Sequence, residues 1–284
     1  MAPDKSPLLG VHSSALEERL NHIESLLPKL ESELLTLQDK GYRTLTKSND
    51  FDLVTEADLH SEKVLIGAIQ ESFPKDAILS EESQENGQGQ ITDGITWVID
   101  PIDGTVNYAN GLHHWGVSVG ICYKQKPVAG IVSAPALNLK YRAILGNGAT
   151  KNGRPISVSD KKVLKQGVVC TGFPYDRAHR AEPLSRALAN MLRVAGGVRR
   201  LGAASLDFCQ LADSTLLGYY EMQLKPWDMA AGLIIAEEAG AKISDFNGKP
   251  VNLMKSHGVV VANPTIHEEL LPLTAPMLDA IAAY

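Results

Sequence analysis

Two aspartates three positions apart are the residues of this chain that most resemble a metal site. Asp100 and Asp103 end the apolar run WVIDPID, which starts at Trp97 and continues into Gly104 and Thr105. Carboxylates that converge on a turn oppose each other's charge unless a cation lies between them, and Mg²⁺ prefers carboxylate and phosphate oxygens. The pair therefore predicts a divalent metal site, although an Asx turn with a helix N-cap would explain one of the two aspartates. The amides of Gly104 and Thr105 open a helix and could bind phosphate.

Three further acidic positions lie at the ends of predicted elements. Glu81 follows a short apolar strand, Asp228 begins an apolar helix, and Asp58 ends a capping-box pattern that starts at Thr55. Each has a plain structural interpretation, as a solvated carboxylate or a helix cap. Because sites on layered α/β folds are built where elements end, the set together favours a common acidic site.

The charge balance points to the same chemistry. Asp plus Glu exceed Lys plus Arg by 33 to 27, a formal net charge of −6. This charge argues against a nucleic-acid or anionic-membrane partner, and an acidic protein that binds phosphate needs positive charge from a source such as a metal ion. Because the chain has three scattered cysteines, no signal-peptide pattern and no apolar run of ~18–20 residues, we predict buried free thiols and a cytoplasmic location.

The pattern of apolar residues predicts mixed sheets layered with helices, an α+β or layered α/β fold. Residues 1–14 are predicted to be a disordered tail, and a leucine stripe predicts a helix from Leu16 to Leu37 that Pro28 should kink or break. A loop or hairpin at 44–57 and a turn-rich segment at 146–155 complete the first half. Strands are expected at 77–80, 95–99, 115–123, 127–134, 139–145, 167–171, 197–200, 216–222, 241–244 and 258–262. Helices are expected from Asp58, at 178–194, 203–212 and 228–239, and after the N-cap Asn263.

Five segments, in matching order and spacing, give the chain a specific resemblance. They read DLVTEAD at 52–58, SEES at 80–83, DPIDGT at 100–105, GAAS at 202–205 and KPWDMAAG at 225–232. Over about residues 16–270 the chain resembles the inositol monophosphatase family. The resemblance implies a layered α-β-α-β-α sandwich and a homodimer. It also implies one phosphatase unit at 15–284, with a metal-binding α+β half at 15–150 and an α/β half at 151–284.

The resemblance implies a site with about two or three Mg²⁺ ions. Glu81, Asp100 and the carbonyl of Ile102 would bind the first ion. Asp100, Asp103 and Asp228 would bind the second, and a looser third ion would rely on Glu81. The same resemblance implies inhibition by lithium.

The resemblance also implies the roles of the catalytic residues. Asp58 and Thr105 would form a dyad that, with Glu81, orients and deprotonates the attacking water. Lys47 would belong to the metal-binding loop. The implied contacts to substrate come from the amides of Gly104 and Thr105 and from Asp103, Ala204, Glu221 and Asp228. One departure is Leu217, which stands where most relatives carry Asp and puts the finer substrate specificity in question.

The predicted reaction is Mg²⁺-dependent hydrolysis of a small phosphorylated polyol or sugar by in-line attack of a metal-activated water. Asn107-Tyr108 after the first motif resembles inositol monophosphatases, so inositol monophosphate is the first candidate. The alternatives are fructose-1,6-bisphosphate, a nucleotide 3′-phosphate and histidinol phosphate, or a non-catalytic regulatory protein. A calcium-binding module is disfavoured because the chain contains no D-x-D-x-D-G loop.

Overall fold

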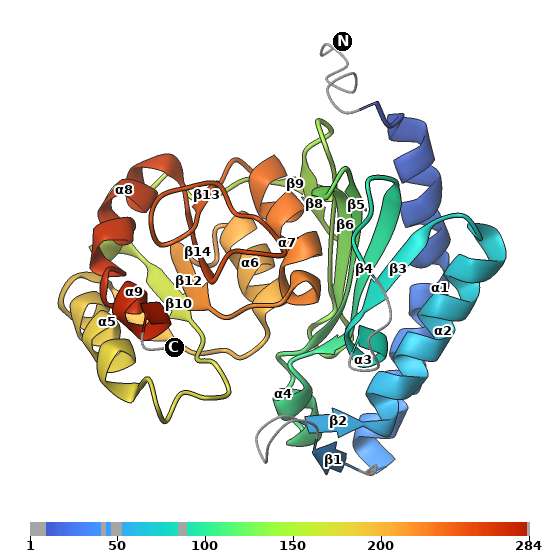
Figure 1. The fold of residues 1–284 in the computed structure, drawn as a ribbon, viewed down its shortest axis with the longest axis horizontal. Helices are drawn as coiled ribbons and strands as arrows, with labels where there is room; N and C mark the ends of the chain where they lie inside the picture. Colours follow the sequence, from blue (N-terminus) through green and yellow to red (C-terminus); the bar gives the residue numbers. More distant parts are fainter. Residues whose placement is uncertain (1–9, 41–43, 47–52, 85–89, 283–284) are drawn as a thin grey trace.

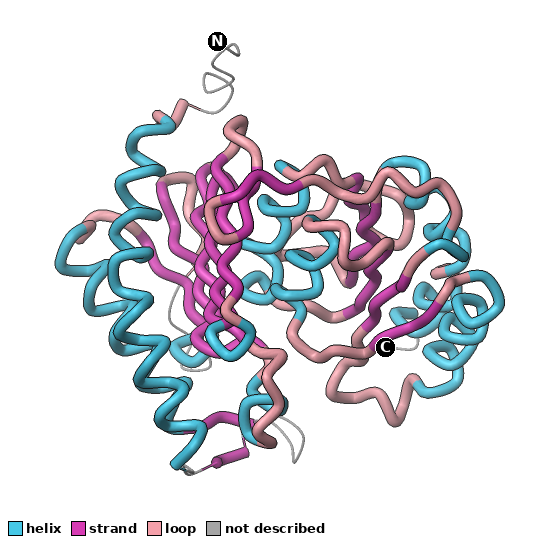
Figure 2. Tube along the Cα trace, turned by 180° about the vertical axis from the view of Figure 1, so that it is seen from behind, coloured by secondary structure: helices cyan, strands magenta, loops and turns pink. Residues whose placement is uncertain are grey.

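Two β-sheets alternate with three layers of helices (Figure 1). The computed structural model describes residues 10–40, 44–46, 53–84 and 90–282, so Lys47 and most of the predicted tail lie outside the described residues. The layers follow the order α-β-α-β-α, which confirms the predicted sandwich; the same order is visible from behind in Figure 2. The helical layers are α1 (Ser13–Lys40) with α2 (Glu56–Ser72), α6 (Ala204–Ala212) with α7 (Pro226–Glu238), and α5 (Ala181–Val194) with α8 (Pro264–Leu273) and α9 (Pro276–Ala282).

The first sheet carries the aspartate pair. Its strand order is β3-β4-β5-β6-β7-β8-β9, with β3 and β4 parallel and the other neighbours antiparallel. The strands are β3 (Ala77–Ser80), β4 (Ile95–Asp103), β5 (Gly116–Tyr123), β6 (Lys126–Ala134), β7 (Leu139–Ile144), β8 (Ala149–Lys151) and β9 (Arg154–Ile156).

Two predictions for this sheet need correction. β4 runs past residue 99 to include Asp103, with an irregular register after Asp100, and the turn-rich segment holds a hairpin around Asn152-Gly153.

The second sheet lies on the far side of α6 and α7. Its order is β11-β10-β12-β14-β13; β10 is parallel to β11 and β12, and β14 is antiparallel to β12 and β13. The strands are β10 (Val168–Thr171), β11 (Gly197–Arg199), β12 (Gly218–Met222), β13 (Lys242–Ser244) and β14 (Gly258–Ala262). One buried cluster joins Val98 of the first sheet, Phe208 of α6 and Tyr219 of the second sheet. The two sheets and α6 therefore share one core cluster.

The smaller elements lie beside the sheets. They are the antiparallel pair β1 (Thr44–Thr46) and β2 (Leu53–Thr55), α3 (Glu81–Gln84), α4 (Thr105–Ala109), η2 (Pro135–Leu137) and η3 (Leu164–Gln166). The β1–β2 pair confirms the predicted hairpin. No helix in the described part of the chain is both long and apolar enough to cross a membrane.

The first helix corrects two predictions. α1 begins at Ser13, so the last two residues assigned to the tail are helical. It also continues through Pro28, and the predicted break there is wrong. Proline removes one backbone hydrogen bond, but the leucine stripe around it, including Leu27 and Leu30, is buried in the core. Burial of each such side chain contributes about 1.5–3 kcal/mol, which offsets the missing bond.

Candidate active site

Asp100 is the most deeply buried carboxylate of the predicted metal site. It lies in β4, and its Oδ1 atom is buried without a hydrogen-bond partner among the described residues. Burial raises the pKa of this carboxyl well above its usual range, and the charges of Glu81, Asp103, Asp228 and Asp58 raise it further. The fold thus brings together the acidic residues that the sequence placed at separate element ends.

Ser118 gives a second sign that the surroundings of Asp100 are incompletely satisfied. The residue lies directly across from Asp100 on β5, and its hydroxyl is also buried without a described partner. A buried polar group without a hydrogen bond is costly, and each such group in a native fold calls for an explanation such as an ion or water. A cation bound at Asp100 would satisfy the carboxylate.

Asp103 connects the first sheet to α6. Its Oδ1 accepts a hydrogen bond from the amide of Ala204 at 3.1 Å, and its Oδ2 accepts the amide and hydroxyl of Ser205 at 2.7 and 2.5 Å. These amides belong to the first turn of α6, where a helix has unpaired donors. Burial raises the pKa of Asp103 to about 6, although the bonds from Ser205 oppose the rise. Asp103 therefore fixes the start of α6 in addition to its predicted metal role.

Gly104 turns the chain from β4 into α4. Its φ is +88°, a left-handed conformation that favours glycine. A Cβ there would lie 3.0 Å from the Cβ of Ala203 and 3.1 Å from the carbonyl oxygen of His114. Space and backbone angle therefore both require glycine. The first i→i−4 bond of α4 runs from the amide of Tyr108, so the amides of the preceding turn are available to a ligand.

Thr105 and Asp58, the two residues of the predicted dyad, are in contact. The Thr105 hydroxyl lies 3.1 Å from Oδ1 of Asp58 and 3.0 Å from the carbonyl of Ile102, and its single proton can serve only one of them at a time. The other oxygen of Asp58 accepts the amide and hydroxyl of Thr55, which completes the predicted capping box. Burial raises the pKa of Asp58 to about 6.

Asp228 reaches the acidic group because α7 packs closely on the first sheet. A Cβ on Gly120 of β5 would lie 2.6 Å from the Cβ of Ala230, so the helix can approach only a glycine there. Oδ2 of Asp228 accepts the amide of Lys225 at 2.7 Å as the helix begins. Burial and then the charge of Glu81 raise the pKa of Asp228 well above its usual range. Glu81 itself is the first residue of α3 and directly follows β3, the predicted short apolar strand.

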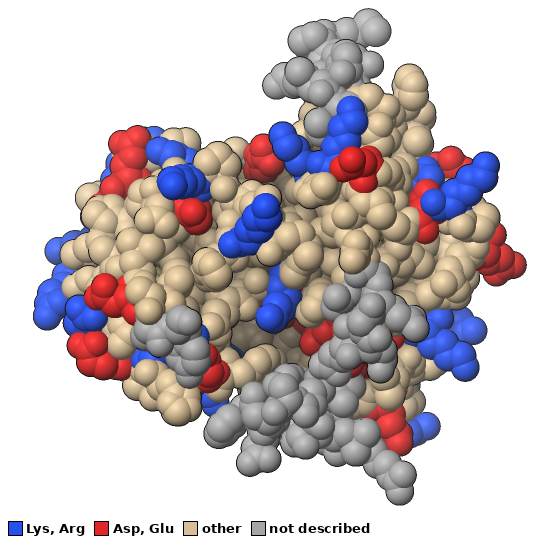
Figure 3. All heavy atoms as spheres, viewed as in Figure 1, with Lys and Arg blue, Asp and Glu red and all other residues tan. Residues whose placement is uncertain are grey.

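The acidic group is not a ready-made metal site in its present side-chain conformations. No three His, Cys, Asp or Glu side chains of the described residues are close enough together to form a ligand set. Asp103, Asp228 and the carbonyl of Ile102 accept bonds from neighbouring groups, whereas Oδ1 of Asp100 does not. Oδ2 of Asp103 accepts two bonds from Ser205, whereas Oδ1 of Asp103 and Oδ2 of Asp228 each accept one from the described residues. A carboxylate oxygen has two lone pairs, so Oδ1 of Asp103 and Oδ2 of Asp228 each keep one for a metal. The surface is hollowed between the two halves, with charged side chains at its edge (Figure 3).

Glu221 lies on β12 and approaches the acidic group from the second sheet. Its Oε2 accepts a hydrogen bond from the Tyr219 hydroxyl at 2.7 Å. Burial raises the pKa of Glu221 to about 8; the charges of Asp207 and Asp103 also raise it, whereas the charge of Arg200 lowers it. The glutamate is therefore near Asp103 but attached to a different sheet.

Ala204 and Leu217 lie in different surroundings. Ala204 is buried at the start of α6, where its amide donates to Asp103. Leu217, the departure from the family pattern, packs in a separate apolar cluster with Val169 and Leu184. Its side chain therefore belongs to the core and not to the acidic group.

Several polar contacts of this region could not be predicted from the sequence. Asp207 of α6 is buried beside the ring of His114, with Oδ1 and Nε2 3.2 Å apart. The Asn107 amide donates to the carbonyls of His114 and Leu201 at 2.6 and 2.8 Å. These bonds join α4 to the segment before α6, and no local motif marks them.

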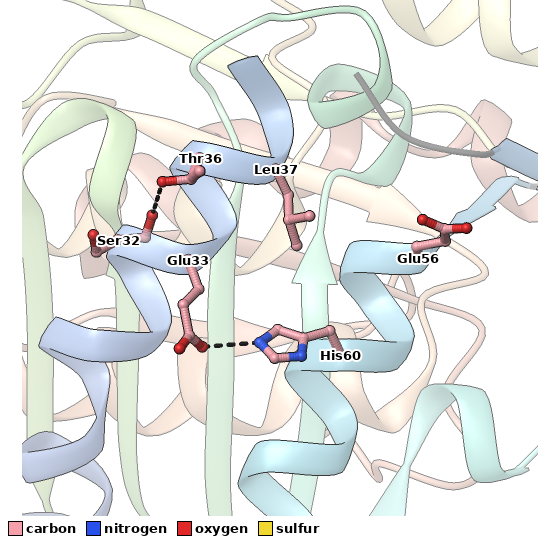
Figure 4. Close-up of a pocket in the computed structure, with 6 residues that line it drawn as sticks. All are labelled: Ser32, Glu33, Thr36, Leu37, Glu56 and His60. Carbon is pink, nitrogen blue, oxygen red and sulfur yellow. Dashed lines mark hydrogen bonds and ion pairs between the residues drawn. The ribbon is translucent and has the colours of Figure 1, made fainter. Parts of the chain in front are cut away.

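Two grooves elsewhere on the molecule flank α1. One, of about 470 Å³, lies between α1 and α2 and contains the bond between Glu33 and His60, whose Oε2 and Nε2 are 2.9 Å apart (Figure 4). The other, of about 440 Å³, lies between α1 and the segment from Ser133 to Asn152. None of the carboxylates around Asp100 lines either groove.

The relationship to known proteins agrees with this geometry. A model of the inositol monophosphatase family matches residues 13–278. The chain belongs to the inositol monophosphatase family. This family member is 36% identical to the Nus factor SuhB of Vibrio cholerae over 262 residues, 91% of this chain and 92% of the relative. It is 37% identical to the inositol-1-monophosphatase of Synechocystis over 240 residues, 84% of this chain and 82% of the relative.

Solved structures of the family have the same fold. The Thermotoga maritima IMPase is 31% identical, with a TM-score of 0.84 over 93% of this chain and 99% of that one. An IMPase/NADP phosphatase complexed with NADP and Ca²⁺ is 25% identical, with a TM-score of 0.80 over 91% and 95% of the chains. The family and these structures support a phosphatase that uses divalent metal.

Proposed function

We propose that this member of the inositol monophosphatase family is a Mg²⁺-dependent phosphatase that hydrolyses the phosphate monoester of a small polyol, with inositol monophosphate as the first candidate. The observation that carries the proposal is the buried, unpartnered Oδ1 of Asp100 among acidic side chains. A buried carboxylate oxygen of this kind requires a cation or a proton. The supporting comparison is the match to inositol-1-monophosphatase over most of both chains.

The residues around Asp100 would hold the metal. Asp100 would contribute its unpartnered oxygen, and Glu81, Asp103, Asp228 and the carbonyl of Ile102 would complete the ligands. Bound Mg²⁺ would supply the positive charge that the acidic site lacks and would lower the pKa of a bound water. Mg²⁺ loses its bound waters reluctantly and is usually held by a few carboxylates, several waters and the substrate phosphate. A site with a few carboxylates, such as this one, suits that type of coordination.

Thr105 and Asp58 would handle the proton of the attacking water. When the Thr105 hydroxyl donates to Oδ1 of Asp58, at 3.1 Å, its lone pairs can still accept a hydrogen bond from water. Asp58 is anchored at its other oxygen by Thr55, so the pair is preorganised. Such general-base arrangements typically contribute ~10²–10⁴-fold to the rate.

The phosphate and the polyol would contact opposite sides of the site. The amides of Gly104 and Thr105, which open α4, would donate to phosphate oxygens. Glu221, on the second sheet, would bind hydroxyl groups of the leaving group, because a carboxyl can bond two adjacent hydroxyls. This division predicts that phosphate binding and polyol recognition can be separated by mutation.

The decisive experiment is a panel of phosphate monoesters assayed with Mg²⁺ and with EDTA. We expect release of phosphate from inositol monophosphate with Mg²⁺, loss of turnover with EDTA, and inhibition by Li⁺. Fructose-1,6-bisphosphate, a nucleotide 3′-phosphate, NADP and histidinol phosphate test the alternative substrates. Full turnover of metal-stripped protein in EDTA would reject the proposal.

A regulatory role is the second candidate function. It is favoured by the 36% identity to a relative named as a Nus factor across nearly all of both chains. A wild-type protein with no turnover on any member of the panel, at saturating Mg²⁺, would favour this role over catalysis. The predicted homodimer can be tested in the same preparation by light scattering.

A further inference from the structure

A hydroxyl two residues from Glu221 fixes the orientation of its carboxyl. Side chains at alternate positions of a strand share a face, and Tyr219 and Glu221 stand in this relation on β12. The Tyr219 hydroxyl donates to Oε2 of Glu221 at 2.7 Å. Because a hydroxyl has one proton, this bond commits the tyrosine to the glutamate and directs Oε2 towards it.

The ring of Tyr219 is itself held firmly. It is fully buried and meets Phe208 of α6 edge-on, with the ring centroids 4.9 Å apart and an interplanar angle of 79°. Phe208 in turn packs against α7, where a Cβ on Gly232 would lie 2.7 Å from it. α6 carries the amides that hold Asp103, and α7 carries Asp228. The tyrosine hydroxyl is therefore tied to the helices that position the acidic group.

Gly172 leaves the space that the Glu221 carboxyl occupies. This glycine follows β10, the strand next to β12. A Cβ there would overlap all three atoms of the carboxyl group. Even alanine at 172 would therefore force the carboxyl to move.

We propose that Tyr219 and Gly172 are positioning residues that determine specificity for polyol phosphates by fixing the carboxyl of Glu221. The Tyr219 hydroxyl holds Oε2, and the empty side-chain position at 172 lets the carboxyl lie where Oε1 can bond a substrate hydroxyl. Neither residue touches the substrate. The inference rests on the proposed function, because it assigns the means by which that site selects its substrate.

The test is Tyr219→Phe, with Tyr220→Phe as the matched control. Tyr220 loses the same hydroxyl from the next position of β12, but its side chain lies on the opposite face of the strand and packs in a different core cluster. Kinetics are measured with inositol monophosphate and with p-nitrophenyl phosphate, which has no hydroxyl beside the ester. For Tyr219→Phe we expect KM for inositol monophosphate to rise ~10-fold with kcat nearly unchanged, since a bond made equally in ground and transition states is weakened. Both constants for p-nitrophenyl phosphate should change less than ~2-fold.

Gly172→Ala should give the same split between substrates. The overlap involves the end of a flexible side chain, so the variant is expected to fold, with the Glu221 carboxyl displaced. A double variant tests the mechanism. If Tyr219 acts through Glu221, then Tyr219→Phe should have no further effect on selectivity when added to Glu221→Gln.

The outcomes separate the inference from the proposed function. Unchanged selectivity in Tyr219→Phe, while Glu221→Gln loses selectivity, overturns the inference alone. Equal losses on both substrates also overturn it, since they indicate a structural role for the tyrosine. Absence of Mg²⁺-dependent turnover in the wild type on every phosphate overturns both. A change in Tyr220→Phe equal to that in Tyr219→Phe overturns the assignment to one hydroxyl.

Discussion

Replacing Thr105 by valine tests the water-activating dyad most directly. Valine keeps the shape and the β-branch of threonine, so the first turn of α4 should remain intact. The variant loses the hydroxyl that lies 3.1 Å from Oδ1 of Asp58 and 3.0 Å from the carbonyl of Ile102. Only one of those bonds exists at a time, and a bond to a charged group is worth about 1.5–3 kcal/mol.

The structural loss and the catalytic loss have different sizes. A stability loss of about 1.5–3 kcal/mol in a domain of this size lowers Tm by roughly 3–12 °C. A lost general base lowers kcat by ~10²–10⁴-fold, equivalent to about 3–5 kcal/mol in the barrier. A residue that only supports α4 would show the first effect without the second at an assay temperature far below Tm.

The assay is phosphate release at saturating Mg²⁺ and inositol monophosphate, with Tm measured on the same preparations. Thr105→Ser is the control, because it retains the hydroxyl and removes one methyl group; its kcat should stay within several-fold of the wild type, far from the ~10²-fold loss of the valine variant. If Thr105→Val lowers Tm but keeps more than about a tenth of the wild-type kcat, the dyad does not activate the water.

Three further predictions use the same measurements. Asp103→Asn should abolish most activity and also lower the free energy of unfolding by about 1–3 kcal/mol. Both carboxylate oxygens accept bonds from α6, and the amide nitrogen of asparagine cannot accept one. An unchanged Tm would contradict the predicted loss of stability. Gly104→Ala should destabilise the fold by about 1–3 kcal/mol through its left-handed backbone and crowded Cβ, and a Tm equal to that of the wild type would show that the turn can relax. In EDTA, Tm should fall as the pH rises from about 4 to about 8. The pKa values of Asp58 and Glu221 in the folded protein are raised to about 6 and about 8. The protonated carboxyls therefore stabilise the fold at low pH, and this stabilisation is lost as they ionise. Glu221→Gln should flatten the upper part of that pH profile, and an identical slope would remove Glu221 from the explanation.

Local sequence patterns determined much of the fold and of the candidate site. The capping box at Thr55 and Asp58, the N-cap Asn263 and the leucine stripe of α1 all involve residues a few positions apart. Their hydrogen bonds and faces follow from helix geometry alone, so they could be predicted without knowledge of the tertiary fold. The acidic residues of the candidate site could likewise be identified from the sequence, because metal binding requires particular residue types.

The tertiary structure decided how those residues meet. The bonds from α6 to Asp103 join residues about a hundred positions apart, and the packing of α7 on Gly120 brings Asp228 to the acidic group. Short strands such as β8 contain too few residues to show a period, and buried leucines carry α1 through Pro28. The raised pKa of Glu221 depends on burial and on Asp207 in another element. These features depend on which faces of the helices and sheets pack together. The packing is decided by the burial energy summed over the whole core, and a short window of sequence carries no information about that sum.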